Sequence, residues 1–154
     1  MDSPTCETVP RCGEIVEWSL APYEQRFGRF PRKKGEGATK TVYEACDLKE
    51  GKLVAWSEIS TSALTPEERA RVNAEVFLLE QVKSDHIVEY LATWATEEKV
   101  VLITALVESG DLLNFIRSHS AKLKVIKKWC RQIISGVKYL HSFYPPIIHR
   151  DLKV

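Results

Sequence analysis

One clear helix start lies between two groups of predicted strands, and it limits the folds that this chain can adopt. Thr65-Pro66-Glu67-Glu68 places a hydroxyl at the N-cap, proline at the first helical position and an acid at the third. Apolar residues then recur at the three- and four-residue spacing of one helix face, at Val72, Val76, Leu79 and Val82. The sequence therefore predicts a helix over residues 66 to about 82.

Runs of β-branched and aromatic residues predict strands on both sides of this helix. Three precede it, and the first is interrupted by Pro31: Arg26 to Lys33, Lys40 to Cys46 and Leu53 to Ile59. Two follow it: Ile87 to Leu91 and Val100 to Thr104. Because the turns at Gly35-Glu36-Gly37 and Asp47 to Lys52 are short, we expect the first three strands to be adjacent and antiparallel.

The last third of the sequence is helical. Asp111 to Arg117 predicts a short helix, and Leu123 to Ser142 predicts a longer one that ends before Pro145-Pro146. Ile147-Ile148 then reads as a short strand. Strands with one inserted helix, followed by helices, predict an α+β fold rather than alternating βαβ units.

Composition excludes several functional classes. The chain has 154 residues, 44% of them hydrophobic and 28% charged, which predicts a folded core. Its 22 basic and 21 acidic residues give a net charge of +1, so we expect no nucleic-acid partner. The apolar run Val100 to Val107 is too short to span a bilayer, and Met1 to Glu7 has no secretory signal. The cysteines form no CxxC pair, so we expect reduced thiols in the cytoplasm.

Residues 1–25 permit two interpretations. Ile15, Val16, Trp18 and Leu20 are compatible with a short docking strand. Prolines and a glycine break any longer period, however, and a loosely held N-terminal extension is the expected alternative.

The most specific chemical motif lies at the end of the chain. His149-Arg150-Asp151-Leu152-Lys153, after a helix and an apolar pair, is typical of the opening of a protein-kinase catalytic loop. In such a loop the Asp accepts or orients the proton of the attacking hydroxyl, and the Lys neutralises charge on the transferred phosphate. The alternative is a charged surface loop after a helix.

A kinase also needs an ATP site upstream, with a Gly-rich hairpin and a cation for the phosphates. Gly35-Glu36-Gly37 followed by Val42 is compatible with the hairpin, although Lys40 occupies the third glycine position. The next strand reads Val54-Ala55-Trp56-Ser57 where kinases carry Val-Ala-Ile-Lys. Ser57 therefore replaces the lysine that normally binds phosphate.

These two departures compensate for each other. Side chains alternate along a strand, so Lys40 and Val42 share a face, as do Ala55 and Ser57. Val42 and Ala55 are the positions that would cover adenine. Neighbouring strands lie about 4.8 Å apart, a distance that a lysine stem can cross. We therefore expect Lys40 to deliver its ammonium to the place vacated at Ser57; the alternative is an ordinary exposed lysine at a turn.

This combination resembles the WNK ("with no lysine") serine/threonine protein kinases, which relocate the lysine in this way. Four segments carry the resemblance, which covers Arg26 to the last residue: Gly35 to Tyr43, Val54 to Glu58, Trp129 to Ile133 and Pro145 to Lys153. It implies a protein-kinase-like fold, with an antiparallel N-lobe over residues 26–104, a hinge over 105–109 and the start of the C-lobe over 110–154, after an extension over 1–25.

The resemblance also implies site residues. Glu75 would pair with Lys40, Asp151 and Lys153 would act in catalysis, and Thr104 would be the gatekeeper. The implied nucleotide-binding residues are Gly35, Glu36, Gly37, Ala38, Thr39, Lys40, Val42, Ala55, Thr104, Ala105, Leu106, Val107 and Lys153. Lys34 departs from the pattern, because most kinases place an apolar residue there against adenine.

The leading hypothesis is ATP- and Mg²⁺-dependent transfer of phosphate to Ser/Thr hydroxyls of protein substrates. The resemblance implies signalling that includes Ste20-like kinases. The alternative is a truncated, non-catalytic module that binds nucleotide or a partner. Because the sequence stops at Val154, before the Asn and DFG-type Asp that hold Mg²⁺ in kinases, we expect these 154 residues alone not to transfer phosphate.

Overall fold

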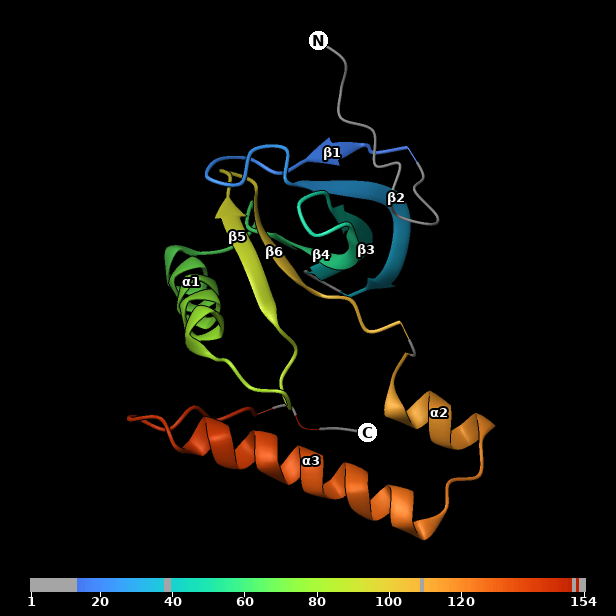
Figure 1. Cartoon of the computed structure of the whole chain (residues 1–154). Helices are drawn as coiled ribbons and strands as arrows, with labels where there is room; N and C mark the ends of the chain where they lie inside the picture. The colour runs from blue at the N-terminus through green and yellow to red at the C-terminus, as the bar shows by residue number, and fades with distance from the viewer. Residues whose placement is uncertain (1–13, 38–39, 109, 151, 153–154) are drawn as a thin grey trace. The chain divides into compact units, whose positions relative to one another are not determined.

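The computed structural model describes residues 14–37, 40–108, 110–150 and 152, and it contains a sheet and three helices within those ranges. The chain divides into two compact units. The first comprises residues 1–81 and 90–106, and the second comprises residues 82–89 and 107–154. Figure 1 shows the elements of each unit along the chain.

A six-stranded antiparallel sheet forms the first unit, in the order β1-β2-β3-β4-β6-β5. The strands are β1 (Glu17–Trp18), β2 (Phe27–Glu36), β3 (Lys40–Asp47), β4 (Lys52–Ser60), β5 (Tyr90–Ala95) and β6 (Lys99–Ala105). The sheet curls strongly, and helix α1 (Pro66–Gln81) lies beside β5 (Figure 1). The predicted α+β class, the adjacent first strands and the inserted helix are confirmed.

Two strand predictions for the first unit need correction. β2 continues through Pro31 instead of being interrupted there, because the register with β3 shifts between Arg29 and Lys33 and the proline falls in that irregularity. The strand predicted at Ile87 to Leu91 in fact begins at Tyr90. Pairing with β6 starts there, so that Ala92 and Trp94 are buried, whereas Ile87 lies in a turn closed by its N–H donating to the Ser84 carbonyl at 3.1 Å.

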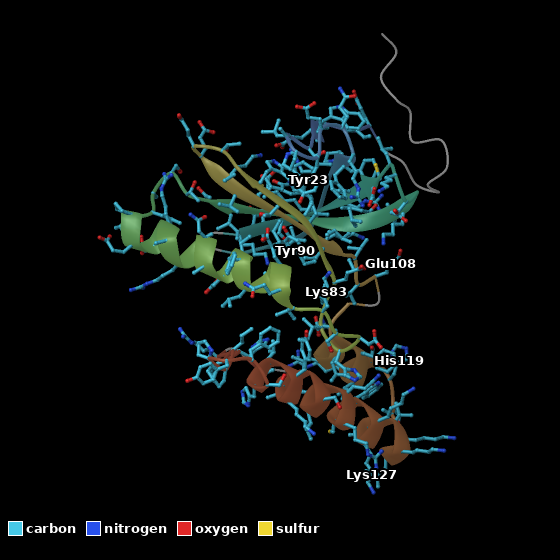
Figure 2. The ribbon with its side chains drawn as sticks, turned by 60° about the vertical axis from the view of Figure 1, so that its left-hand side comes forward. Tyr23, Lys83, Tyr90, Glu108, His119 and Lys127 are labelled. Atoms are coloured by element: carbon cyan, nitrogen blue, oxygen red, sulfur yellow. The ribbon has the colours of Figure 1, made fainter. Side chains whose placement is uncertain are left out.

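Helix α1 begins where the sequence predicts. The Glu68 N–H donates to Thr65 Oγ1 at 3.2 Å, and the Thr65 N–H donates to the Glu68 carboxylate at 2.9 Å, which completes the capping box. At the other end, the Tyr90 hydroxyl donates to Glu80 at 2.6 Å, and Figure 2 shows Tyr90 beside that end of the helix. Burial and the Glu80 carboxylate both raise the pKa of Tyr90, which keeps its hydroxyl protonated as the donor.

The second unit contains α2 (Leu112–Ser118) and α3 (Leu123–His141). Both helices predicted in this part of the chain are therefore confirmed. Asp111 caps α2 by accepting the Asn114 N–H at 2.8 Å. A Cβ added at the buried Gly136 of α3 would lie 3.1 Å from the His86 carbonyl oxygen, so the helix packs closely against that turn. The strand predicted at Ile147-Ile148 is wrong: this pair follows the helix end, and the Ile147 N–H donates to the Leu140 carbonyl instead of to a strand.

One face of the sheet holds the main core, and we call it the core face. Its buried cluster contains Phe27, Ala45, Val54, Trp56, Ala92, Trp94, Val101 and Ile103. The rings of Trp56 and Trp94 meet edge to face with centroids 4.9 Å apart, and Tyr23 packs against the cluster from the segment before β2. Aromatic burial of this kind dominates the stability of a small domain.

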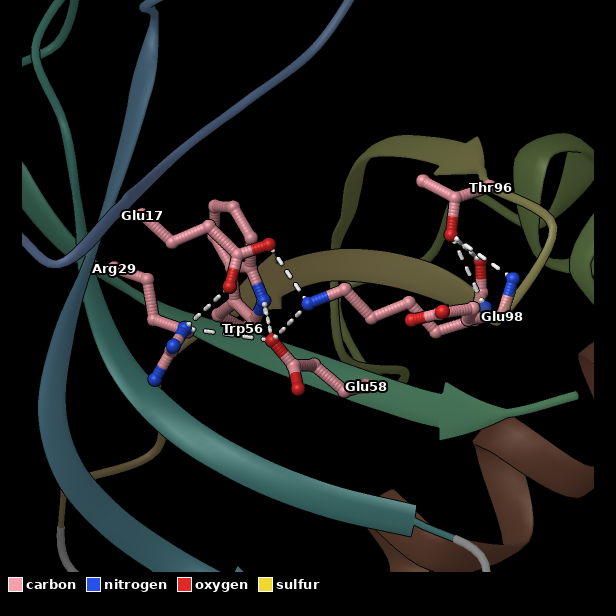
Figure 3. A network of polar contacts seen from close by, with 7 residues as sticks. Glu17, Arg29, Trp56, Glu58, Thr96 and Glu98 are labelled. Carbon is pink, nitrogen blue, oxygen red and sulfur yellow. Dashed lines mark hydrogen bonds and ion pairs between the residues drawn. The ribbon is translucent and has the colours of Figure 1, made fainter. Parts of the chain in front are cut away.

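An ion-pair network joins the N-terminal segment to this sheet. The Glu17 carboxylate binds Arg29 Nε at 3.0 Å and Lys99 Nζ at 2.7 Å (Figure 3). Glu58 accepts from Lys99 at 2.9 Å and from Trp56 Nε1 at 3.0 Å. Of the two interpretations of this segment, the docking strand is therefore what the structure contains over β1.

Candidate active site

The predicted phosphate lysine and the predicted adenine cover share one face of the sheet. Val42 lies directly opposite Ser57, and Ala55 lies directly opposite Thr104. Directly opposite residues of antiparallel strands point to the same face, and Lys40 lies two residues before Val42. We call this the lysine face, and its members are Lys40, Val42, Ala55, Ser57, Leu102 and Thr104. It is the reverse side of the strands that carry the core face.

Lys40 stands diagonal to Ser57 on this face, since its own direct partner is Ile59. Diagonal neighbours on adjacent strands lie roughly 7–8 Å apart, within reach of a long side chain. Lys40 is exposed, whereas Ser57 is 4% exposed. The register therefore gives Lys40 access to the surroundings of Ser57, as expected if Lys40 replaces the lysine missing at that position.

Three lysines flank the Gly-rich turn, and they differ in their partners. Lys33 Nζ binds Glu36 at 2.8 Å, and Lys34 Nζ binds Glu44 at 2.6 Å. Within the described ranges Lys40 has no acidic partner within 4.0 Å. The local charges leave this one ammonium of the three available for an external anion.

The Gly-rich turn is tight at its base and open above its first glycine. The Gly37 N–H donates to the Lys40 carbonyl at 2.7 Å, which closes the hairpin. A Cβ added at Gly35 would have no heavy atom within 4 Å, so there is space over that backbone for a bound group. Glu36 is held by Lys33, while Ala38 and Thr39 lie outside the described residues.

The other predicted site residues are spread along the chain. Glu75 is exposed on α1, and it forms no ion pair with Lys40 within 4.0 Å in the part of the chain described. Ala105 ends β6, Leu106 follows it half-buried, and Val107 is exposed in the second unit. Asp151 and Lys153 lie outside the described residues. The structure thus brings together the lysine and the adenine-cover positions, and it does not join Glu75 to them.

Glu44 is a residue of this face that sequence reasoning missed. It lies directly opposite Ala55 and is 3% exposed, and Arg32 and Lys34 of β2 both contact its carboxylate. The available signal was the unusual Lys34 combined with an acid two residues after Val42.

Neither a metal cluster nor a bilayer span is found among the described residues. No three His, Cys, Asp or Glu side chains there are grouped to hold a metal ion. None of the helices described is long and apolar enough to cross a bilayer.

Comparison with known sequences identifies relatives of this chain. The protein kinase domain family matches residues 29–154. A serine/threonine-protein kinase WNK from Caenorhabditis elegans is 38% identical over 135 residues, covering 83% of this chain and 7% of the relative. WNK3 from Mus musculus is 39% identical over 133 residues, covering 83% of this chain and 8% of the relative. The chain therefore spans less than a tenth of the length of these curated relatives.

Comparison with solved structures supports the fold. Rad53 residues 1–466, whose crystal structure contains AMP-PNP, matches with a TM-score of 0.72 and 28% identity. The match covers 84% of this chain and 33% of the Rad53 chain. The curled sheet with its inserted helix is thus the arrangement of a protein kinase fold.

Proposed function

This chain belongs to the protein kinase domain family and is related to the WNK serine/threonine kinases, and on that premise we propose that it binds ATP on the lysine face of its sheet. Lys40 would contact the phosphates, and Val42 and Ala55 would cover the adenine. Ala105, Leu106 and Val107 would offer backbone groups to the edge of the base. More specifically, we propose that the protein is a WNK-like serine/threonine kinase whose phosphate-binding lysine lies in the Gly-rich turn.

The observation that carries this proposal is that Lys40 forms no ion pair with an acid among the described residues. Its ammonium lies on the face that also carries the adenine-cover positions, and an unneutralised cation there suits a polyphosphate. The space above Gly35 lets a phosphate approach the backbone of the turn. Ser57 cannot supply the charge, because a hydroxyl is neutral.

In the complete kinase reaction, ATP supplies the γ-phosphoryl group that is transferred to a Ser or Thr hydroxyl. Asp151 would accept or orient the proton of that hydroxyl, and Lys153 would neutralise charge on the phosphate. Glu75 would hold Lys40 once the two side chains meet. Mg²⁺ accompanies ATP in this family, and the described residues contain no acidic cluster that would hold it.

A second function, nucleotide or partner binding without phosphate transfer, is favoured by one observation. Glu75 is exposed and does not pair with Lys40 within 4.0 Å in the described part of the chain, so the cation lacks the acid that orients it in active kinases. For the whole protein we propose protein substrates, signalling that includes Ste20-like kinases, and a cytoplasmic setting that suits reduced cysteines and ATP.

Binding of ADP by the purified chain tests the nucleotide proposal. Lys40→Met should weaken binding at least tenfold, because a charge pair at about 4 Å is worth on the order of 4 kcal/mol at an effective dielectric near 20. Ser57→Ala should leave the dissociation constant within about twofold, and Lys33→Met serves as the matched lysine control. Isothermal titration calorimetry measures all three. Equal loss of affinity in Lys40→Met and Ser57→Ala would refute the relocated lysine.

A further inference from the structure

A buried carboxylate on the lysine side of the sheet has no role in the proposed function. Glu44 is 3% exposed, lies directly opposite Ala55 and follows Val42 by two residues, so it borders the adenine-cover positions. An ionised carboxylate that is taken out of water needs a cationic partner. Lys34 Nζ supplies it at 2.6 Å, and Arg32 lies further away at 3.8 Å.

Lys34 occupies an irregularity of β2 that aims its side chain at Glu44. Lys33 pairs with Tyr43 and Gly35 pairs with Val42, so Lys34 is the extra residue with no direct partner on β3. Such bulges redirect a side chain relative to a regular strand. The Lys34 backbone therefore lies next to Gly35 and Val42, while its ammonium reaches a carboxylate beside Ala55. The aliphatic stem of the lysine extends between these two places.

A lysine held in this way can present apolar surface. Long basic side chains lay their methylene stems along apolar groups while the charged head stays with water or a polar partner. The side chain of Lys34 is 37% exposed, so part of it is already covered. Its ammonium is fixed at the far end by Glu44, and the stem is therefore the part of Lys34 left to face a ligand under Val42.

We propose that Glu44 is a positioning residue that draws the Lys34 ammonium aside, so that the Lys34 stem covers the base of a bound adenine nucleotide. This inference rests on the proposed nucleotide site and deepens it. The lysine stem takes the place of the apolar side chain that a kinase usually places before the first glycine. The contact is made to the base rather than to the phosphates, so it applies to adenosine as well as to ADP.

The Glu44→Gln variant tests this role, because it keeps the shape of the side chain and removes its charge. Released from Glu44, the Lys34 ammonium no longer holds its stem over the base, and affinity for both ADP and adenosine should fall about tenfold. Ligand-observed NMR titrations measure both affinities. Lys33→Met is the matched control, because it breaks the exposed Lys33–Glu36 pair of the same turn at a residue outside the proposed site and should change neither affinity.

Two double variants separate the stem from the charge. Lys34→Met with Glu44→Gln keeps an unbranched apolar stem and needs no carboxylate, so affinity should return to within about threefold of the wild type. Lys34→Ala with Glu44→Gln has no stem and should remain as weak as Glu44→Gln. Both double variants carry no charge at positions 34 and 44. Thermal unfolding of each shows whether it is folded. Their difference therefore carries the test even where Glu44→Gln alone does not fold.

The outcomes distinguish this inference from the proposed function. If ADP binding depends on Lys40 but both double variants bind adenosine equally, the positioning role of Glu44 is overturned and the nucleotide site stands. The same holds if Glu44→Gln is folded and binds as the wild type does. If the wild type binds neither ADP nor adenosine, the proposed function fails, and this inference fails with it.

Discussion

The two faces of one sheet use the same strands for different purposes. Trp56 and Ser57 are neighbours on β4, yet Trp56 is fully buried in the aromatic cluster of the core face while Ser57 belongs to the lysine face. The core face is rich in large apolar side chains, whereas the lysine face carries an exposed cation and the proposed base-covering residues. Alternation along a strand thus separates the residues that stabilise the fold from those that would contact a ligand.

Charges are arranged differently on the two faces as well. Glu58 lies two residues after Trp56 on β4, so the ion-pair network belongs to the core face. In this network Arg29 and Lys99 each contact both Glu17 and Glu58, so every charge is shared (Figure 3). Burial disfavours the charged form of Glu17, but hydrogen bonds from Lys99 and Arg29 outweigh this and lower its pKa. Lys40 has no comparable acid among the described residues. Arg29 and Lys99, which stabilise the fold, are paired with acidic side chains, whereas Lys40, which is proposed to bind the ligand, has no such pair among the described residues.

The largest expected effect breaks the core face. Trp56→Ala removes a side chain that is 0% exposed and should lower the free energy of unfolding by about 4 kcal/mol, since the cavity adds to the lost apolar burial. Urea denaturation measures this. Ser57→Ala on the neighbouring residue is the control and should cost less than about 1 kcal/mol. Similar losses for both variants would show that the two faces are not energetically distinct.

A smaller effect concerns acid sensitivity at the edge of the core face. Asp47 is fully buried and accepts two hydrogen bonds from Arg26, at 2.8 and 3.1 Å. Burial opposes its charge, but Arg26 and the N–H groups of Glu50 and Lys49 outweigh this and lower its pKa. The folded pKa is below the unfolded pKa of about 3.9, so Asp47 stabilises the fold above that pH, and its contribution is lost as pH falls through the folded value.

Asp47→Asn should therefore cost about 2 kcal/mol at pH 7, as expected for hydrogen bonds to a charged group. It should also flatten the decline in stability between about pH 5 and pH 2 relative to the wild type. Denaturant unfolding at several pH values provides both numbers. Parallel curves for the two proteins would mean that other carboxylates govern acid sensitivity, with Glu17 the next candidate.

Much of the fold could be predicted from local signals in the sequence. The capping box at Thr65 and Glu68 fixes the start of α1, because its two hydrogen bonds depend only on residues three apart. The shared face of Lys40, Val42, Ala55 and Ser57 followed from strand alternation together with an antiparallel pairing. These features depend on short-range geometry that the sequence itself encodes.

The remaining features depend on contacts between distant segments. The start of β5 at Tyr90 is set by pairing with β6 and by burial of Ala92 and Trp94, which the apolar pair Ile87 and Val88 obscures. The Lys34–Glu44 pair arises from a register shift between β2 and β3, and no local sequence pattern predicts this shift. The same is true of the ion pairs that Glu17 forms across the sheet with Lys99.

Moving the lysine between its two positions tests the central claim most directly. Lys40→Ala should abolish measurable ADP binding, and adding Ser57→Lys to that variant should restore it, because both positions serve the same phosphate from one face of the sheet. The measurement is the ADP dissociation constant of the double variant, with its folding checked by thermal unfolding. We expect a value within about tenfold of the wild type. A folded double variant that binds ADP no better than Lys40→Ala would contradict it.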